Sequence, residues 1–282
     1  MLKLCVSYTN LIRVESVFAI FYAVFPQAVL GKPLPMRVQR TDRFREGVIM
    51  GDRGRYAGPC GVPPLSCAIC SNRKEKRFCL AVHGRICPQC CGEQRERTLD
   101  CPSECPYLQQ ARQHEKPRQL EDAPPEEVFP KVELSDEFLQ AREPVISGIL
   151  QTIGRLSRRD RSLNDREVIA ALVNLAKSYR TLVGSGLIYE QVPPSLAQQA
   201  LIEAVRQLLQ EFRELEREHL GHTTLKDADV LKVLVLALRL AHIHTSGRPL
   251  SRAFLDFLHD RFAEALSSIA AADEPGSRII MP

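Results

Sequence analysis

The sequence predicts a mainly α-helical protein, with a small cysteine-rich module on its amino-terminal side and a helical bundle after it. Two observations carry this prediction. Nine of the ten cysteines lie between Cys60 and Cys105, and after residue 135 apolar residues recur at helical spacing. A chain of 282 residues with 44% hydrophobic and 26% charged residues has room for one ordinary core and a smaller unit.

The first 64 residues show no regular period. Their apolar stretch VFAIFYAVFPQAVL at 17–30 follows Lys3 and Arg13 and superficially matches a signal peptide. Glu15 and Pro26 confine that stretch to fewer residues than the ~20 that a spanning helix needs. We expect residues 1–64 to be largely disordered, or to be an extension upstream of a later start, and we expect a cytoplasmic protein without a membrane span.

Charge is distributed unevenly along the chain. Residues 1–118 carry 19 Lys/Arg against 10 Asp/Glu, whereas residues 119–282 carry 19 against 24. The amino-terminal side is therefore basic and the carboxy-terminal side acidic. An excess of Lys and Arg is typical of a segment that contacts an anionic partner.

The cysteines from 67 to 105 have the spacing of metal ligands. Two Cys-x2-Cys pairs, Cys67/Cys70 and Cys87/Cys90, lie 16 residues apart and can supply the four thiolates that a tetrahedral zinc ion requires. No cysteine follows Cys105, so a disulfide scaffold that staples the whole chain is not indicated. We predict a first zinc site at these four residues.

The remaining cysteines of the module form a second set, interleaved with the first. Interleaving predicts two cross-braced zinc sites, or one zinc if the second set is not filled. His83 could replace Cys91, since Cys79-x3-His83 has the spacing of Cys101-x3-Cys105, and His114 is a further substitute. The second set is Cys79, Cys91, Cys101 and Cys105.

The last two cysteines are expected to lie at the start of a helix. Asp100 can cap it and Pro102 suits its first turn. A ligand pair at a helix start, after a knuckle and a short hairpin, outlines a treble-clef arrangement. Glu93, Glu96 and Glu104 are interpreted as solvated charges.

Other uses of the thiols are less well supported. CPQC at 87–90 resembles the CPxC of thioredoxin-like enzymes, but the βαβ context of those motifs is missing. Spacing alone also permits an iron–sulfur cluster. A site with four thiolates is closed, whereas catalytic zinc needs an open position.

The run CAIC…RFC…ICPQCCGEQRE…CPSECPYLQQAR resembles a group of bacterial proteins with a CxxC…C…CxxCCG…CPxxCxYL signature. It is also loosely similar to HIT and MYND cross-braced zinc fingers, which usually complete their second site with a late His and Cys; here only His114 is available. The resemblance covers residues 65–116. It implies zinc binding and protein recognition, and it implies no reaction.

A basic cluster lies between the first two groups of cysteines. Arg73, Lys74, Lys76 and Arg77 have the cation density that phosphate contacts need, but only Phe78 and Tyr107 are near for base stacking. Nucleic-acid binding is therefore an alternative, ranked below protein contact.

We expect an extended linker over residues 117–134, because this segment is rich in Pro, Asp and Glu. Residues 135–272 predict an antiparallel bundle of five helices, and 273–282 a flexible tail. Helix starts are expected at Ser135, Asn164, Ser195, Thr224 and Pro249.

Two of these helices have informative faces. VLKVLVLALRLAHI at 230–243 is apolar nearly all round, which predicts the central buried helix; only Lys232 and Arg239 interrupt it, on one face. The helix after Ser195 carries a packing seam, which would be an interface if exposed: Leu201, Val205, Leu208, Phe212 and Leu215.

No catalytic constellation is found in the bundle. We therefore expect a non-enzymatic zinc-binding adaptor, with a protein partner at the finger and a second contact or homodimer through the bundle. The alternatives are a nucleic-acid-associated zinc protein and a thiol-redox or metal-sensing protein.

Overall fold

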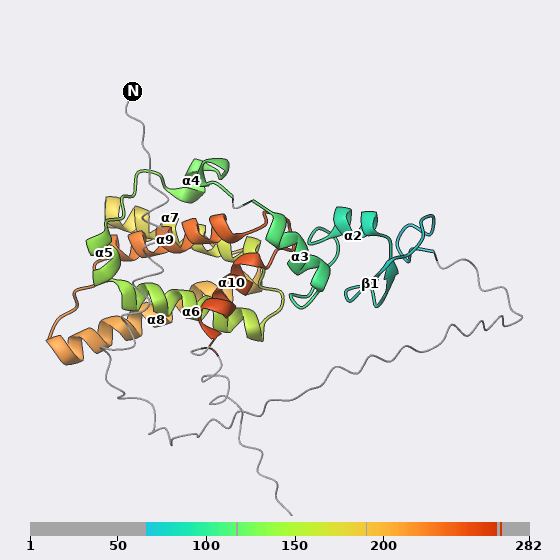
Figure 1. Cartoon of the computed structure of the whole chain (residues 1–282). Helices are drawn as coiled ribbons and strands as arrows, with labels where there is room; N and C mark the ends of the chain where they lie inside the picture. The colour runs from blue at the N-terminus through green and yellow to red at the C-terminus, as the bar shows by residue number, and fades with distance from the viewer. Residues whose placement is uncertain (1–65, 117, 190, 264–265, 267–282) are drawn as a thin grey trace, which may run out of the picture. The chain divides into compact units, whose positions relative to one another are not determined.

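The computed structural model describes residues 66–116, 118–189, 191–263 and 266, and over this part the protein is mainly helical, as the sequence predicts (Figure 1). The expectations for residues 1–64 and for the tail after 273 lie outside the described residues. The described part comprises a small cysteine-rich segment, which we call the finger (residues 66–116), and a set of packed helices, which we call the bundle (residues 135–263).

The finger contains little regular structure. Strands β1 (Arg77–Cys79) and β2 (Gly84–Ile86) form an antiparallel hairpin in which Phe78 pairs with Arg85. Helix α2 (Pro88–Gln94) follows directly, and helix α3 (Pro106–His114) closes the segment. Apart from cysteines, Ile86 and Leu108 are the hydrophobic residues buried in the finger. Apolar burial on this scale is too small to fold about fifty residues.

The bundle is built from six helices in the described residues. These are α5 (Asp136–Ala141), α6 (Glu143–Arg159), α7 (Asp165–Ser185), α8 (Leu196–Leu220), α9 (Asp227–His244) and α10 (Ala253–Arg261). Helix α9 packs against α7, α6 and α10, and α8 packs against α6 and α7 (Figure 1).

The ends of these helices follow from local chemistry. The side chains of Ser135, Asn164 and Ser195 each accept a hydrogen bond from the backbone N–H three residues later, as N-caps do. Helices α7 and α8 end at Gly186 and Gly221, which adopt φ of 71° and 76°, a conformation that costs glycine little. The predicted starts at Ser135, Asn164 and Ser195 are confirmed.

Helix α9 is the centre of the bundle, as its composition predicts. Residues on most of its circumference are buried, and four of them are completely buried: Val230, Leu234, Val235 and Leu238. The two cations on its remaining face are used in packing. Arg239 donates hydrogen bonds to the carbonyls of residues 128, 129 and 132, and Lys232 lies over the ring of Phe138.

The sequence predicts an extended linker at 117–134, but the described residues of this segment, 118–134, are ordered against the bundle. It contains a 3-10 turn η2 (Leu120–Asp122) and a short helix α4 (Pro125–Val128), and Val128 and Phe129 are buried. Arg239 of α9 donates hydrogen bonds to three backbone carbonyls of this segment. The proline-rich composition of the segment did not reveal this contact, because the contact depends on a residue more than a hundred positions away.

Several element boundaries also differ from expectation. Helix α3 begins after Cys105, not at Asp100, because Pro106 occupies its first turn. Helix α9 begins at Asp227, three residues after Thr224, and α10 begins at Ala253, not Pro249. The helix expected to start at Ser135 ends at Ala141, and Arg142 separates it from α6, so the described bundle has six helices where the sequence predicts five.

None of the helices among the described residues combines the length and apolarity needed to cross a membrane.

The start of α9 depends on Glu216 of α8, which binds the turn before it. The Glu216 carboxylate accepts hydrogen bonds from the hydroxyls of Thr223 and Thr224 and from the N–H groups of Thr224 and Leu225. Burial opposes ionisation, but these four donors outweigh it and lower the pKa of Glu216 to about 2.

We predict that Glu216→Gln lowers the free energy of unfolding by about 1 kcal/mol at neutral pH, a figure discounted because Glu216 is partly solvated. The folded-state pKa is depressed, so this stabilisation is complete above pH ~4.5 and is lost as the pH falls towards 2. Urea titrations followed by circular dichroism at several pH values test it. Glu214→Gln is the matched control, because Glu214 lies on the same helix and accepts a hydrogen bond from Gln210 at the surface. Equal effects of the two variants would contradict the assignment.

Candidate metal centre

The first Cys-x2-Cys pair lies in a tight turn before β1. The Ser71 N–H donates to the Cys67 carbonyl, and the Cys67 N–H donates to the Arg73 carbonyl, so the chain reverses directly after the two thiols. Ser71 takes a positive φ of 53° in this turn. The reversal lets Cys67 and Cys70 face the same point.

The second pair lies at the start of α2. Cys87 is the N-cap of this helix and its sulfur accepts a hydrogen bond from the Cys90 N–H at 3.4 Å. Pro88 occupies the first turn, where a missing N–H costs nothing. The Cys87 N–H in turn donates to the Cys67 sulfur at 3.2 Å, which ties the two pairs together.

The four sulfurs of these pairs form one cluster. The thiols of Cys67, Cys70, Cys87 and Cys90 all lie within 4.8 Å of one another. Around a zinc ion with bonds of ~2.3 Å, tetrahedral sulfurs are separated by roughly 3.8 Å, so a small contraction would suffice. Cys67, Cys87 and Cys90 are buried, and none of the eight described cysteines is in a disulfide. A four-sulfur set of this shape suits zinc or iron.

The pKa shifts at the cluster favour partial ionisation. Burial opposes it at Cys67, but backbone donors at residues 70, 87 and 69 lower the pKa of this thiol to about 6. The Cys90 N–H lowers the pKa of Cys87. Burial, with the neighbouring sulfurs, raises the pKa of Cys90 to about 12. Four thiols this close cannot all ionise without a cation between them.

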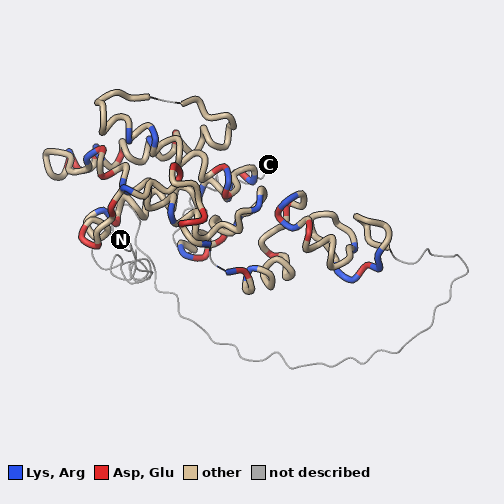
Figure 2. The backbone as a smooth tube through the Cα atoms, turned by 90° about the horizontal axis from the view of Figure 1, so that it is seen from above, with Lys and Arg blue, Asp and Glu red and all other residues tan. Residues whose placement is uncertain are grey.

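Two of the four cations in the basic cluster point towards sulfur. Arg73 is next to the metal-ligand set, and a hydrogen bond to the Cys87 sulfur raises the pKa of this arginine. Arg77 lies over the Tyr107 ring and donates to the Cys91 sulfur at 3.6 Å. Lys74 and Lys76 are exposed. Figure 2 shows where Lys and Arg lie along the backbone of the finger. Because sulfur engages two of the four cations, the cluster offers fewer free cations to phosphate than its sequence suggests.

The structure does not bring the second set of thiols into one cluster. Among the described residues, only the first set forms a group of three or more ligand side chains within 4.8 Å. Cys91 accepts hydrogen bonds from Arg77 and Arg95 instead. Cys79 and Cys105 interact electrostatically with Cys101, whose pKa is raised by burial. The proposed substitutes His83 and His114 are exposed and join no such group.

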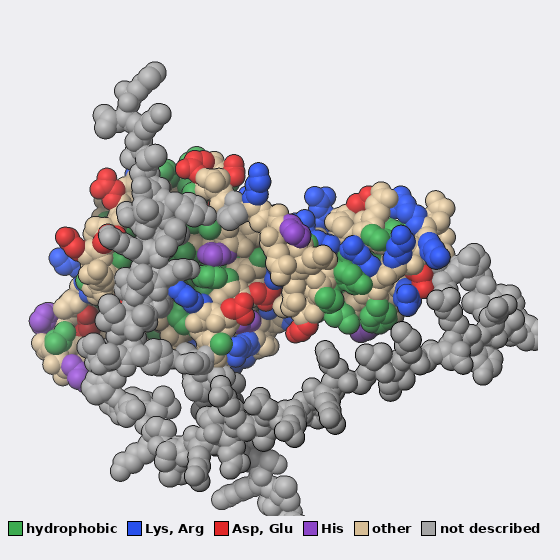
Figure 3. All heavy atoms as spheres, in the orientation of Figure 1, with side chains coloured by type: hydrophobic (Ala, Val, Ile, Leu, Met, Phe, Trp, Pro, Cys, Tyr) green, Lys and Arg blue, Asp and Glu red, His purple; other side chains and the backbone are tan. Residues whose placement is uncertain are grey.

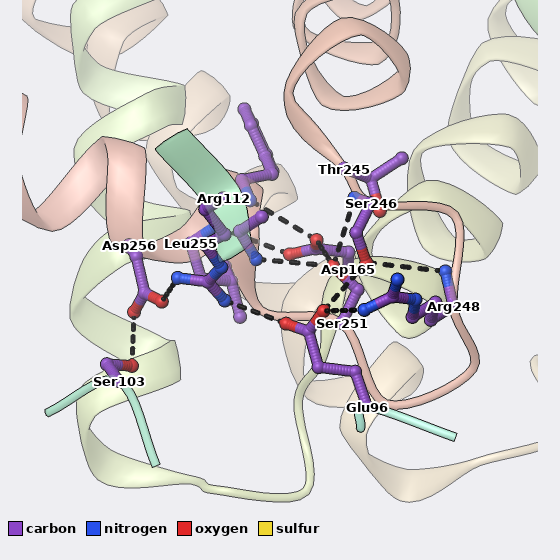
Figure 4. Close-up of polar contacts among 12 residues, drawn as sticks. Glu96, Ser103, Arg112, Asp165, Thr245, Ser246, Arg248, Ser251, Leu255 and Asp256 are labelled. Carbon is purple, nitrogen blue, oxygen red and sulfur yellow. Dashed lines mark hydrogen bonds and ion pairs between the residues drawn. The ribbon is translucent and has the colours of Figure 1, made fainter. Parts of the chain in front are cut away.

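Glu96 connects the finger to the bundle, and its interpretation as a solvated charge is wrong. Its side chain is only 1% exposed. The carboxylate accepts hydrogen bonds from Arg112 at 2.8 Å and from the Ser246 hydroxyl at 3.0 Å, and Arg248 lies 3.7 Å away (Figure 4). The Glu96 carbonyl accepts from the Leu250 N–H. One residue that closely follows the four-thiol cluster in sequence thus contacts both α3 and the loop after α9.

Asp256 of α10 completes this connection, which we call the joint (Glu96, Arg112, Ser246, Arg248 and Asp256). Its carboxylate accepts hydrogen bonds from Arg112 and from the Ser103 hydroxyl (Figure 4). Burial disfavours the charge on Arg112, but the carboxylates of Asp256 and Glu96 outweigh it and raise the pKa of this arginine. Sequence reasoning missed the joint because its members lie up to 160 residues apart, and no local pattern links them.

No protein-family model, curated protein or solved structure matches this chain. The similarity of residues 65–116 to a bacterial zinc-binding signature therefore stays a prediction from sequence.

We predict that Glu96→Gln lowers the free energy of unfolding by about 2–3 kcal/mol, because the buried cation of Arg112 loses one of its two carboxylate partners. Urea titration of the zinc-loaded full chain measures the change. Glu93→Gln is the control, since Glu93 lies in the same segment but contacts Gln89 at the surface. If both variants unfold alike, the joint does not stabilise the protein.

Proposed function

We propose that this chain is a non-enzymatic, zinc-binding adaptor whose finger contacts a protein partner and whose bundle makes a second contact. The single observation that carries the proposal is the cluster of four thiols at Cys67, Cys70, Cys87 and Cys90. Four thiolates would fill the coordination sphere of a zinc ion, leaving no open position for water or substrate. The ion would therefore stabilise the finger, in which apolar burial is small.

The joint supports an adaptor in which finger and bundle act together. Glu96 and Arg112 come from the finger, while Ser246, Arg248 and Asp256 come from the bundle. A finger fixed in this way presents its outer face at a defined distance from the bundle surface. Cytoplasmic localisation is part of the proposal, because thiolate zinc sites persist best in reducing compartments.

Metal analysis of the purified full chain tests the first half of the proposal. We expect bound zinc, and we expect Cys67→Ser and Cys90→Ser to lose it, since each removes a ligand and leaves three. Cys5→Ser is the matched control, because Cys5 lies outside the finger. Iron with visible absorbance in place of zinc, or zinc content unaffected by both substitutions, would contradict the proposal.

The same analysis decides the number of ions. A second zinc at Cys79, Cys91, Cys101 and Cys105, in a cross-braced, treble-clef-like finger, remains our prediction from the interleaved spacing. It requires Cys91 to exchange its arginine donors for the ion. Two ions per chain, falling to one in Cys101→Ser, would support it, and one ion that Cys101→Ser leaves in place would refute it.

The second contact is assigned to the connection between α7 and α8, not to the seam of α8. Leu201 and Val205 of the expected seam are buried within the bundle. Leu187, Ile188, Val192 and Leu196, in contrast, are 69–93% exposed. Exposed apolar residues this close in sequence can form a contact surface, and we propose that they pair with a second copy of this chain.

Light scattering after size-exclusion chromatography tests the homodimer. We expect the full chain to have twice its monomer mass at high concentration, and Ile188→Ser to shift the equilibrium to monomer by removing apolar contact area. Leu220→Ser, at an exposed position at the end of α8, serves as the control. A wild-type chain that stays monomeric across a dilution series would show that this surface does not dimerise.

Thiol-redox or metal-sensing function is the second candidate, and one observation favours it. Cys87 caps α2 with a lowered pKa while Cys90 has a raised one, a difference also useful in dithiol exchange. If the protein retains its zinc in the presence of mild oxidants, this function is contradicted. Release of zinc with reversible formation of a Cys87–Cys90 disulfide would support it.

A further inference from the structure

The finger hairpin exposes apolar side chains on the face turned away from its thiols. Phe78 is 52% exposed, although it is in the middle of β1. Its neighbours Arg77 and Cys79 point the other way, towards Tyr107 and the buried finger core. Because side chains alternate along a strand, Phe78 must then face outwards. Leu80 and Val82, in the turn after β1, are exposed as well.

Two lysines precede these apolar side chains in the sequence. Lys74 and Lys76 are exposed, and neither forms an ion pair with another residue that the structure describes. The other cations nearby are engaged: Arg85 pairs with Glu75, and Arg73 and Arg77 contact cysteine sulfurs. Figure 3 shows hydrophobic side chains gathered on the finger with Lys and Arg around them. Because Lys76 and Phe78 are two residues apart in an extended segment, they lie on the same side of the chain, and this face combines apolar and positive side chains.

This combination fits one kind of partner better than others. Single-stranded nucleic acid needs several stacking platforms and a line of cations, whereas Phe78 is one aromatic ring beside two free lysines. A membrane would need side chains that project well beyond the surface, and Leu80 and Val82 are only 37% and 36% exposed. An apolar anchor flanked by carboxylates matches both kinds of side chain.

We propose that the hairpin face (Lys74, Lys76, Phe78, Leu80 and Val82) binds a short acidic peptide that places a large apolar side chain against Phe78. The carboxylates of the peptide pair with Lys74 and Lys76. This proposal rests on the adaptor function and names the chemistry of the partner. Affinity would be modest and would fall with salt, since the cations are solvent-exposed.

A displayed library of random linear peptides, sorted on the zinc-loaded full chain, tests the proposal. We expect the enriched peptides to combine Asp or Glu with Leu, Ile or Phe. A fluorescein-labelled synthetic copy of an enriched peptide then measures affinity by polarisation. Phe78→Ser should weaken binding about tenfold or more, as loss of an aromatic anchor does. Lys76→Glu should weaken it about fivefold, with the difference shrinking at high salt.

Matched controls separate the face from general effects of substitution. Leu220→Ser removes an exposed apolar side chain from the bundle, and Lys131→Glu reverses the charge of an exposed lysine outside the finger. Both should bind the peptide like the wild type. Zinc content and far-ultraviolet circular dichroism of Phe78→Ser should also match the wild type, because Phe78 is not part of the finger core.

Three results would overturn the proposal: no enrichment of acidic peptides, binding that Phe78→Ser and Lys76→Glu leave unchanged, or tighter binding of the same face to oligo-uridine or to phosphatidylserine vesicles. Enriched peptides whose binding is lost in Ile188→Ser but not in Phe78→Ser would refute the hairpin face and leave the adaptor function standing. Loss of zinc binding, in contrast, would remove the adaptor function itself.

Discussion

The four sulfurs of Cys67, Cys70, Cys87 and Cys90 are the constraint on which the finger depends. They connect the turn before β1 to the start of α2, and the backbone bond from Cys87 to the Cys67 sulfur holds the two in register. Thiolates so close together repel one another unless a cation lies between them. With only two buried aliphatic side chains, the finger gains little folding free energy from apolar burial.

The joint extends this constraint to the bundle. Glu96 follows α2 directly, and α2 begins at Cys87 and contains Cys90, so the position of Glu96 is tied to the four-thiol cluster. Its carboxylate binds Arg112, which also binds Asp256 of α10, and its carbonyl binds the Leu250 N–H. A change at the four-thiol cluster would therefore reach α10 through partly buried contacts.

The bundle was largely predictable from sequence, because its signals are local. The apolar circumference of α9 and the caps at Asn164 and Ser195 depend on residues within a few positions of one another. The first thiol set was predictable for the same reason. The role of Glu96 and the contact of Arg239 with the segment before the bundle were not, since both depend on tertiary neighbours more than a hundred residues away. Spacing could not show that Cys91 faces two arginines.

Amide hydrogen exchange before and after removal of the metal with a chelator tests the central claim most directly. The N–H of Leu250 lies in the bundle, but its hydrogen-bond acceptor is the Glu96 carbonyl in the finger. If bound metal holds the finger and the finger holds the joint, stripping the ion should abolish protection at Cys87, Cys90 and Leu250 while the centre of α9 stays protected. Unchanged protection at all of these amides in metal-free protein would contradict the account.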